Sequence, residues 1–115
     1  MKHPRKLSMN ERKQFILCRE NGVSKAGKYL VVSTFCDESL SELKVAYITT
    51  KKVGKAHQRN AIRRKLRAIT QKHGDNIAGN RYLVTIARWS AASATYSELE
   101  KDWLKLAKRL NILSL

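Results

Sequence analysis

Three arginines are spaced so that their side chains would lie along one side of a helix. Arg59, Arg63 and Arg67 are four residues apart, and residues at i, i+4 and i+8 stand one above another on a helix. A planar guanidinium group can bind two oxygens of a phosphate at once, which the point charge of a lysine cannot do. Asn60 and Arg64 extend the same stripe. The pattern therefore predicts a helix face that binds phosphate groups.

The segment that carries these arginines contains no acidic residue. Between Glu42 and Asp75, ten Lys and Arg residues occur in 32 positions. An ordinary solvated helix intersperses Glu at i+4 to relieve repulsion between like charges, so an external polyanion is the reasonable explanation. The whole 115-residue chain has 24 Lys and Arg against 9 Asp and Glu, a net charge of +15, above the ~2–8 that solubility requires. This excess favours a nucleic acid as the partner, with an anionic membrane surface as the competing interpretation.

A short turn with three lysines precedes the arginines. In the run from Thr50 to Lys55, Gly54 permits a sharp change of direction between a strand and a helix. The free N–H groups of the helix start would then face the same anion as the lysines. The turn lacks the full Walker pattern of a nucleotide-binding loop, so its meaning depends on the arginine stripe that follows it.

The hydrophobic pattern predicts six elements in one domain spanning residues 1–115, of which 1–7 form a basic N-terminal segment. They are a helix over 8–21, strands over 28–36 and 43–50, a helix over 56–73, a strand over 81–89 and a helix that begins at Thr95. Ile62, Leu66 and Ile69 form the inward stripe of the arginine helix, opposite the guanidinium groups. The order α-β-β-α-β-α predicts an α+β sandwich with a small central sheet.

Several other classes of function find no support in the sequence. Cys18 and Cys36 show no metal-binding spacing, and we expect free thiols and a cytoplasmic location. No apolar run approaches the ~20 residues of a membrane span. A protein nuclease would show clustered carboxylates or a His pair, whereas Glu98, Glu100 and Asp102 are explained by capping and by the dipole of the last helix. We therefore predict no catalytic residue and no protein-bound metal.

The run from Lys51 to Arg67 strongly resembles the signature of the bacterial ribonuclease P protein subunit. The family pattern Arg-Asn-x-x-(Lys/Arg)-Arg-x-x-Arg is met at Arg59, Asn60, Arg63, Arg64 and Arg67, after a Lys-Lys-(Val/Ile)-Gly turn at the family's spacing. The resemblance extends over the rest of the chain, from a Phe in the first helix to the Ala-Thr-Tyr entry of a Leu-rich last helix. It implies an α-β-β-α-β-α sandwich of the ribosomal protein S5 domain 2-like kind, with a left-handed βαβ crossover.

The resemblance also implies two sets of site residues. The residues that would bind the catalytic RNA are Lys51, Lys52, Lys55, Arg59, Asn60, Arg63, Arg64 and Arg67. The residues that would line a cleft for the 5′ leader of precursor tRNA are Phe15, Arg19, Tyr29 and Tyr47. Phe15 could equally be a core residue, and Tyr29 and Tyr47 are the weaker candidates because an aromatic residue in a strand usually packs. Arg19 stands near the place where the family usually has a second aromatic residue, so leader binding would depend more on charge than on stacking.

By resemblance, the chain is the protein subunit of an endoribonuclease that removes the 5′ leader and gives the mature tRNA 5′ end. The RNA subunit and its bound Mg²⁺ would carry out the cleavage, while the protein, a monomer when alone, binds the RNA subunit and the precursor tRNA. The alternative is a ribosomal or general RNA-binding protein without a role in tRNA processing. Stimulation of precursor cleavage at low Mg²⁺ distinguishes the two.

Overall fold

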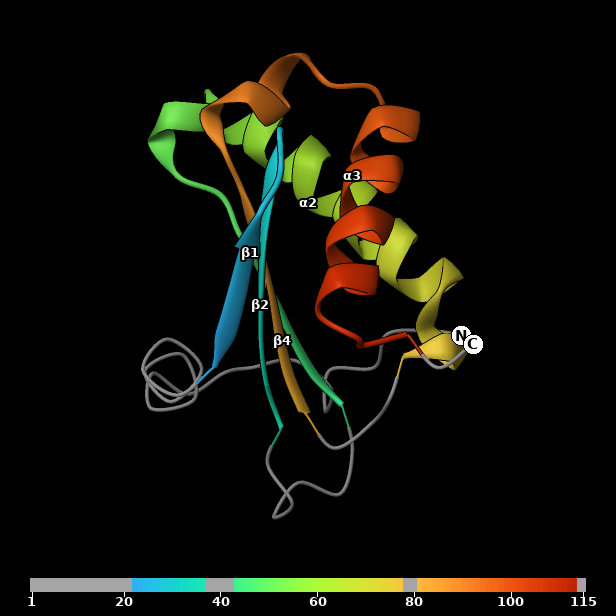
Figure 1. Cartoon of the computed structure of the whole chain (residues 1–115). Coiled ribbons are helices and arrows are strands. Elements are labelled where there is room, and N and C mark those ends of the chain that lie inside the picture. The colour runs from blue at the N-terminus through green and yellow to red at the C-terminus, as the bar shows by residue number, and fades with distance from the viewer. Residues whose placement is uncertain (1–21, 37–42, 78–80, 114–115) are drawn as a thin grey trace.

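A computed structural model describes residues 22–36, 43–77 and 81–113, which form one four-stranded sheet with two helices packed on it (Figure 1). The strands are β1 (Val23–Ala26), β2 (Leu30–Cys36), β3 (Lys44–Ile48) and β4 (Arg81–Ala87), and the helices are α2 (Ala56–Lys72) and α3 (Tyr96–Arg109). Three short 3₁₀ helices connect them: η2 (Lys51–Val53), η3 (Gly74–Asn76) and η4 (Trp89–Ser93). The expected α+β class with a small sheet is confirmed.

The strands lie in the order β1-β2-β4-β3. β1 and β2 form an antiparallel hairpin, β2 and β4 are antiparallel, and β3 and β4 are parallel. The parallel pair is joined through α2, because parallel neighbours need a long connection that a helix usually supplies. Both helices lie on the same side of the sheet in Figure 1. The predicted first helix, 8–21, lies outside the described residues.

The strand β1 corrects the predicted element order. The apolar pattern predicts a first strand that begins at residue 28, but an earlier strand, Val23–Ala26, pairs with β2 from Val23 opposite Thr34 to Ala26 opposite Val31. All four β1 residues are exposed, so the segment has none of the apolar alternation that marks a half-buried strand. Its pairing is through the backbone alone, which leaves little signal in the side chains.

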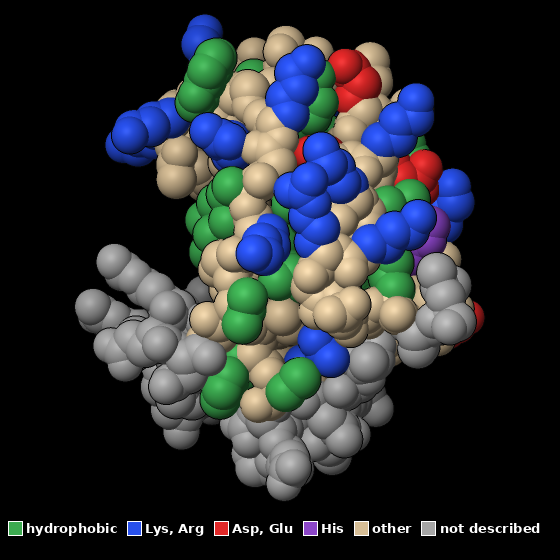
Figure 2. All heavy atoms as spheres, viewed as in Figure 1, with side chains coloured by type: hydrophobic (Ala, Val, Ile, Leu, Met, Phe, Trp, Pro, Cys, Tyr) green, Lys and Arg blue, Asp and Glu red, His purple; other side chains and the backbone are tan. Residues whose placement is uncertain are grey.

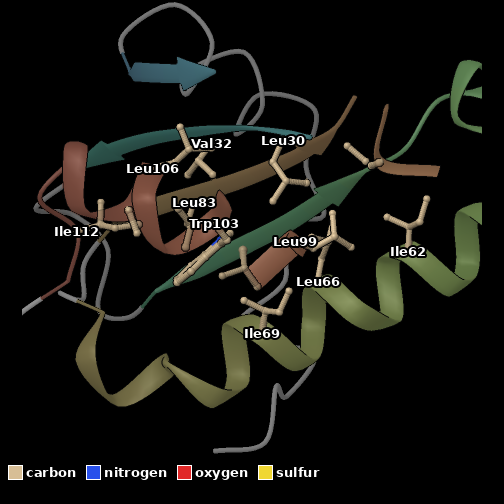
Figure 3. Close-up of a cluster of buried hydrophobic side chains, with 14 of the residues drawn as sticks. Leu30, Val32, Ile62, Leu66, Ile69, Leu83, Leu99, Trp103, Leu106 and Ile112 are labelled. Atoms are coloured by element: carbon tan, nitrogen blue, oxygen red, sulfur yellow. The ribbon is translucent and has the colours of Figure 1, made fainter. Parts of the chain in front are cut away.

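The main core fills the space between the sheet and the two helices (Figure 3). The inward stripe of α2 is confirmed, because Ile62, Leu66 and Ile69 are all buried. Trp103 of α3 is fully buried, and its indole Nε1 donates to Thr85 Oγ1 at 3.3 Å. Removing a side chain such as Leu66 from this core would cost about 2–5 kcal/mol. The core thus fixes the side of α2 that faces inward, and the opposite side must face outward.

The turn between β1 and β2 is fastened to α3 by one carboxylate. Asp102 accepts hydrogen bonds from the backbone N–H groups of Tyr29 and Leu30, each at 3.0 Å, and of Lys28 at 3.3 Å. Gly27 is needed at this turn because a Cβ there would lie 2.3 Å from Asp102 Oδ1. Asp102 is therefore a structural acceptor, which differs from the helix-dipole role expected from its place in the sequence.

Neither helix of the described chain has the length and apolar composition that crossing a membrane requires. Cys36, at the end of β2, is a free and exposed thiol. The other cysteine, Cys18, lies outside the described residues.

Candidate nucleic-acid interface

The lysine turn is held in place by a single buried side chain. Val53 of η2 is buried in the core, while Lys51 and Lys52, which precede it in η2, are exposed. The turn is closed by backbone hydrogen bonds from Val53 N to Thr50 O at 3.0 Å and from Gly54 N to Lys51 O at 3.2 Å. The buried valine therefore anchors a rigid turn whose two lysine side chains face solvent.

Gly54 makes the junction between this turn and α2 possible. Its φ is +144°, a conformation that L side chains rarely adopt. A Cβ on Gly54 would also lie 2.3 Å from Gln58 Oε1, which accepts the backbone N–H of Lys55 at 2.8 Å. The side chain of Gln58 therefore caps the start of α2 by occupying the space that a side chain at position 54 would need.

The outward face of α2 carries the arginine stripe as the spacing predicts. Asn60, Arg64 and Arg67 are exposed, and Arg59 and Arg63 are half-buried. Arg63 donates a hydrogen bond to Asn60 Oδ1, so the two neighbouring members of the stripe hold each other in position. The structure thus brings the predicted RNA-binding residues of α2 to one surface, beside the lysines of η2. We name this surface the cationic face; its members are Lys51, Lys52, Lys55, Arg59, Asn60, Arg63, Arg64 and Arg67.

No carboxylate neutralises the cationic face within the described ranges. The first turn of α2 contains no acidic residue. The described ion pairs of this region lie at the other end of α2, where Lys72 Nζ is 3.0 Å and His73 Nε2 is 3.2 Å from Glu100 Oε2. This contact raises the pKa of Lys72 and lowers the pKa of Glu100. The positive end of the α2 dipole and the arginine side chains therefore both attract an approaching anion.

The acidic residues of α3 have structural partners. Glu98 accepts the N–H of Thr95 at 3.0 Å and the hydroxyl of Tyr29 at 2.8 Å, and the Thr95 bond is the main cause of its lowered pKa. Glu100 binds Lys72, and Asp102 holds the β1–β2 turn. Glu98 is the capping residue, as the sequence predicts, whereas Glu100 and Asp102 bind partners outside α3. Among the described residues no group of three His, Cys, Asp or Glu side chains gathers as a metal site would require.

The two tyrosines expected in a leader cleft are used for packing. Tyr47 contacts the main core, and burial raises its pKa to about 12 against the lowering effects of Thr70 and Arg67. Tyr29 also packs against the main core and donates to Glu98 of α3. Both rings therefore belong to the side of the sheet that the helices cover. The other two cleft candidates, Phe15 and Arg19, lie outside the described residues.

A different aromatic pair lies on the opposite side of the sheet. The rings of Phe35 and Tyr82 are parallel, with centroids 6.3 Å apart, and they belong to a small second cluster with Ala46 and Val84. Tyr82 falls within the strand predicted over 81–89, and the sequence pattern does not single out Phe35. The available signal was the presence of apolar residues at both odd and even positions of β2 and β4, which indicates strands with two covered faces.

Fold and surface together define a class: a small α+β protein with one acid-free cationic helix face of the kind that binds a phosphate backbone. A family profile described as Ribonuclease P matches residues 3–111. The chain is 30% identical over 109 residues to the "Ribonuclease P protein component" of Bacillus cereus strain B4264, covering 95% of this chain and 93% of that protein. It is 27% identical to the protein of the same name from Syntrophomonas wolfei, over 83% and 79% of the two chains.

Two solved structures resemble the fold closely. The RNase P protein of Staphylococcus aureus superposes with a TM-score of 0.87 at 22% identity, covering 93% of this chain and 97% of that one. The RNase P protein of Thermotoga maritima, solved in complex with 1-(4-fluorophenyl)-2-thiourea, gives a TM-score of 0.77 at 25% identity, over 85% and 94% of the chains. The chain belongs to the ribonuclease P protein family. Its function is that of the protein component of ribonuclease P, in tRNA 5′ processing.

Proposed function

We propose that the cationic face binds the phosphate backbone of the ribonuclease P RNA subunit. The observation that carries this proposal is the arginine stripe of α2, which stands outward on a helix whose first turn contains no acid. Each exposed guanidinium can donate two parallel hydrogen bonds to one phosphate. This face has many donors and, within the described chain, few acceptors for them.

The protein's contribution to cleavage, in this proposal, is electrostatic and positional. Cleavage of the phosphodiester bond is assigned to Mg²⁺ held by the RNA subunit. In support, the three acids of α3 are engaged in structural contacts with backbone N–H groups, Tyr29, Lys72 and His73. The protein lowers the repulsion between two RNA molecules and so raises the affinity of the complex for its substrate.

The protein also binds the 5′ leader of precursor tRNA in this proposal. We assign leader contact to Phe15 and Arg19 of the predicted first helix, together with the sheet side that bears Phe35. An aromatic ring on this side can stack an unpaired base, and Phe35 is half-buried. The protein acts as one copy, in the cytoplasm, where the RNA subunit and the precursor tRNA meet.

The decisive experiment adds the purified chain to a bacterial ribonuclease P RNA and a precursor tRNA at moderate salt and low Mg²⁺. We expect the chain to stimulate release of the leader, and the double variant Arg63→Ala/Arg67→Ala to stimulate much less. The matched control is Lys101→Ala/Lys105→Ala, which removes an i, i+4 pair of exposed charges from α3. Absence of stimulation by the unaltered chain refutes the function, and RNA binding without stimulation would indicate a general RNA-binding protein.

A further inference from the structure

A tryptophan with an exposed ring lies beside the cationic face. Trp89, the first residue of η4, is 70% exposed, whereas the other tryptophan, Trp103, is fully buried. Isolated exposed apolar residues are common, so exposure alone assigns no role. The surroundings of Trp89 set it apart, because its backbone is fixed on both sides and its neighbours are cations.

The residues on either side of Trp89 fasten it to the β1–β2 turn. Arg88 Nη1 donates to Gly27 O at 2.7 Å, and Ser90 Oγ donates to Lys28 O at 2.6 Å. Ala91, one residue further on, is buried in the core. The indole ring therefore projects from a fixed backbone, which lowers the entropy lost when a flat ligand stacks on it.

The charge around Trp89 is positive. η4 is in contact with η2, the turn that carries Lys51 and Lys52, and Figure 1 shows the two segments side by side at one end of the molecule. Arg88 precedes the tryptophan, and Lys28 lies in the turn to which it is fastened. Figure 2 shows Lys and Arg side chains over this end of the molecule. The nearby acids, Glu98 and Asp102, are already bound to groups of the protein.

We infer that Trp89 stacks on an unpaired base of the ribonuclease P RNA subunit, as a non-electrostatic anchor next to the phosphate contacts of η2 and α2. Tryptophan offers a large aromatic surface for stacking, and the surrounding lysines and arginines are suited to the phosphates on either side of that base. The RNA subunit is the partner because Trp89 lies beside the lysine turn of the cationic face. The inference rests on the proposed function and adds a contact that charge alone does not supply.

Binding of the full-length chain to a bacterial ribonuclease P RNA tests the inference. Trp89→Ala is expected to weaken binding about tenfold, as loss of one stacked base does, while Trp89→Phe stays within about threefold of the unaltered chain. The salt dependence of Trp89→Ala should be unchanged, because no phosphate contact is lost. The matched control is Val23→Ala, which truncates another large exposed apolar side chain, 57% exposed, on β1. We expect this control to bind normally.

Fluorescence gives a second, independent measurement. The emission of Trp89, obtained as the difference between the unaltered chain and Trp89→Phe, should be quenched by the RNA subunit and become shielded from acrylamide. An emission that the RNA leaves unchanged, or an affinity of Trp89→Ala equal to that of the unaltered chain, overturns the inference. A response only to precursor tRNA that carries a leader also overturns it, in favour of the leader as the stacked strand. In each of these cases normal stimulation of cleavage would leave the proposed function standing, whereas loss of RNA binding by the unaltered chain removes both.

Discussion

The helices α2 and α3 pack on the same side of one sheet but differ in how their charges are arranged. α3 begins with a capping box, in which Thr95 Oγ1 accepts the N–H of Glu98 and Glu98 accepts the N–H of Thr95, and it ends with Lys108 and Arg109. This arrangement complements the helix dipole at both ends. α2 has no acid in its first turn, and its N-cap residue is Lys55. In the same fold, the dipole of α3 is balanced by charged side chains at both ends, whereas the N-terminus of α2 has no acidic side chain to balance it.

This difference assigns two requirements of a small RNA-binding protein, stability and RNA affinity, to two different helices. α3 and its acids supply stability, because they cap the helix, hold the β1–β2 turn and bind the end of α2. The charges of α2 repel one another in the free protein and gain their partner only on binding a polyanion. Removing the acids of α3 should therefore lower stability and leave RNA affinity unchanged, while removing arginines of the cationic face should lower RNA affinity without lowering stability.

The largest effect is expected at Asp102. Asp102→Ala leaves three backbone N–H groups without their acceptor, and we expect it to lower the free energy of unfolding by about 3 kcal/mol. Urea unfolding followed by circular dichroism measures this. The matched control is Asp75→Ala, which removes an exposed acid from η3 and should change stability little. A loss of RNA affinity by folded Asp102→Ala would contradict the division between the two helices.

The next effect concerns affinity. Arg63→Ala/Arg67→Ala should weaken binding to the RNA subunit about 20-fold at 0.15 M salt and lower the slope of log K against log salt by about 1.4–1.8, for two lost phosphate contacts. Stability should stay the same or rise slightly, because alanine is a good helix former and repulsion is relieved. Filter binding at several salt concentrations measures the slope. An equal fall for Lys101→Ala/Lys105→Ala would mean that α3 also binds RNA.

A smaller effect is expected when an acidic residue is placed at the N-terminus of α2, where α3 already has one. Lys55 occupies the N-cap position with extended φ and ψ of −72° and 167°, which suits an aspartate cap. Lys55→Asp should raise stability by about 1 kcal/mol and reduce RNA affinity about fivefold or more. Thermal unfolding and filter binding on the same sample test whether stability rises while RNA affinity falls. Lys55→Ser is the control, since it supplies a cap without the negative charge, and a parallel rise in both quantities would contradict the proposal.

The smallest effect is the dependence of stability on pH. The pKa values of Glu98 and Glu100 are lowered from 4.5, chiefly by hydrogen bonds from Thr95 and Lys72 respectively. A lowered pKa in the folded state gives stability that is present above pH 4.5 and is lost as the pH falls through the folded-state value. We expect Tm to fall in this acidic range, and Glu98→Gln/Glu100→Gln to flatten the dependence. An unchanged pH profile in that variant would place the acid-sensitive groups elsewhere.

The sequence predicted the parts of the molecule that local chemistry determines. The inward and outward faces of α2 follow from a period of 3.6 residues, and the Thr95–Glu98 box is visible as a four-residue motif. The strand β1 was missed because its four side chains are all exposed. The role of Asp102 could not be predicted either, since its partners lie 72 to 74 residues away.

The packing of Tyr29 and Tyr47, the two tyrosines predicted for the leader cleft, could not be predicted from the sequence either. Both Tyr29 and Tyr47 read as strand aromatics, and only the packing of α2 and α3 determines which side of the sheet each ring occupies. The strand predicted over 81–89 included Trp89, but β4 ends at Ala87 and Trp89 stands in a 3₁₀ segment between that strand and a helix. Its exposure became visible only with the structure.

The hydrogen bonds of Asp102 have a consequence for the order in which the protein is made. The β1–β2 turn leaves the ribosome early, but its acceptor belongs to α3 and is synthesised more than 70 residues later. Until then the three N–H groups of the turn must remain bound to water, and the hairpin lacks its attachment to α3. We therefore expect nascent chains arrested before Thr95 to be cleaved readily by protease at this hairpin, and chains arrested well beyond Arg109 to resist. Equal resistance of the two would show that the hairpin is stable without α3. The earliest strands of this fold are thus secured by its last helix.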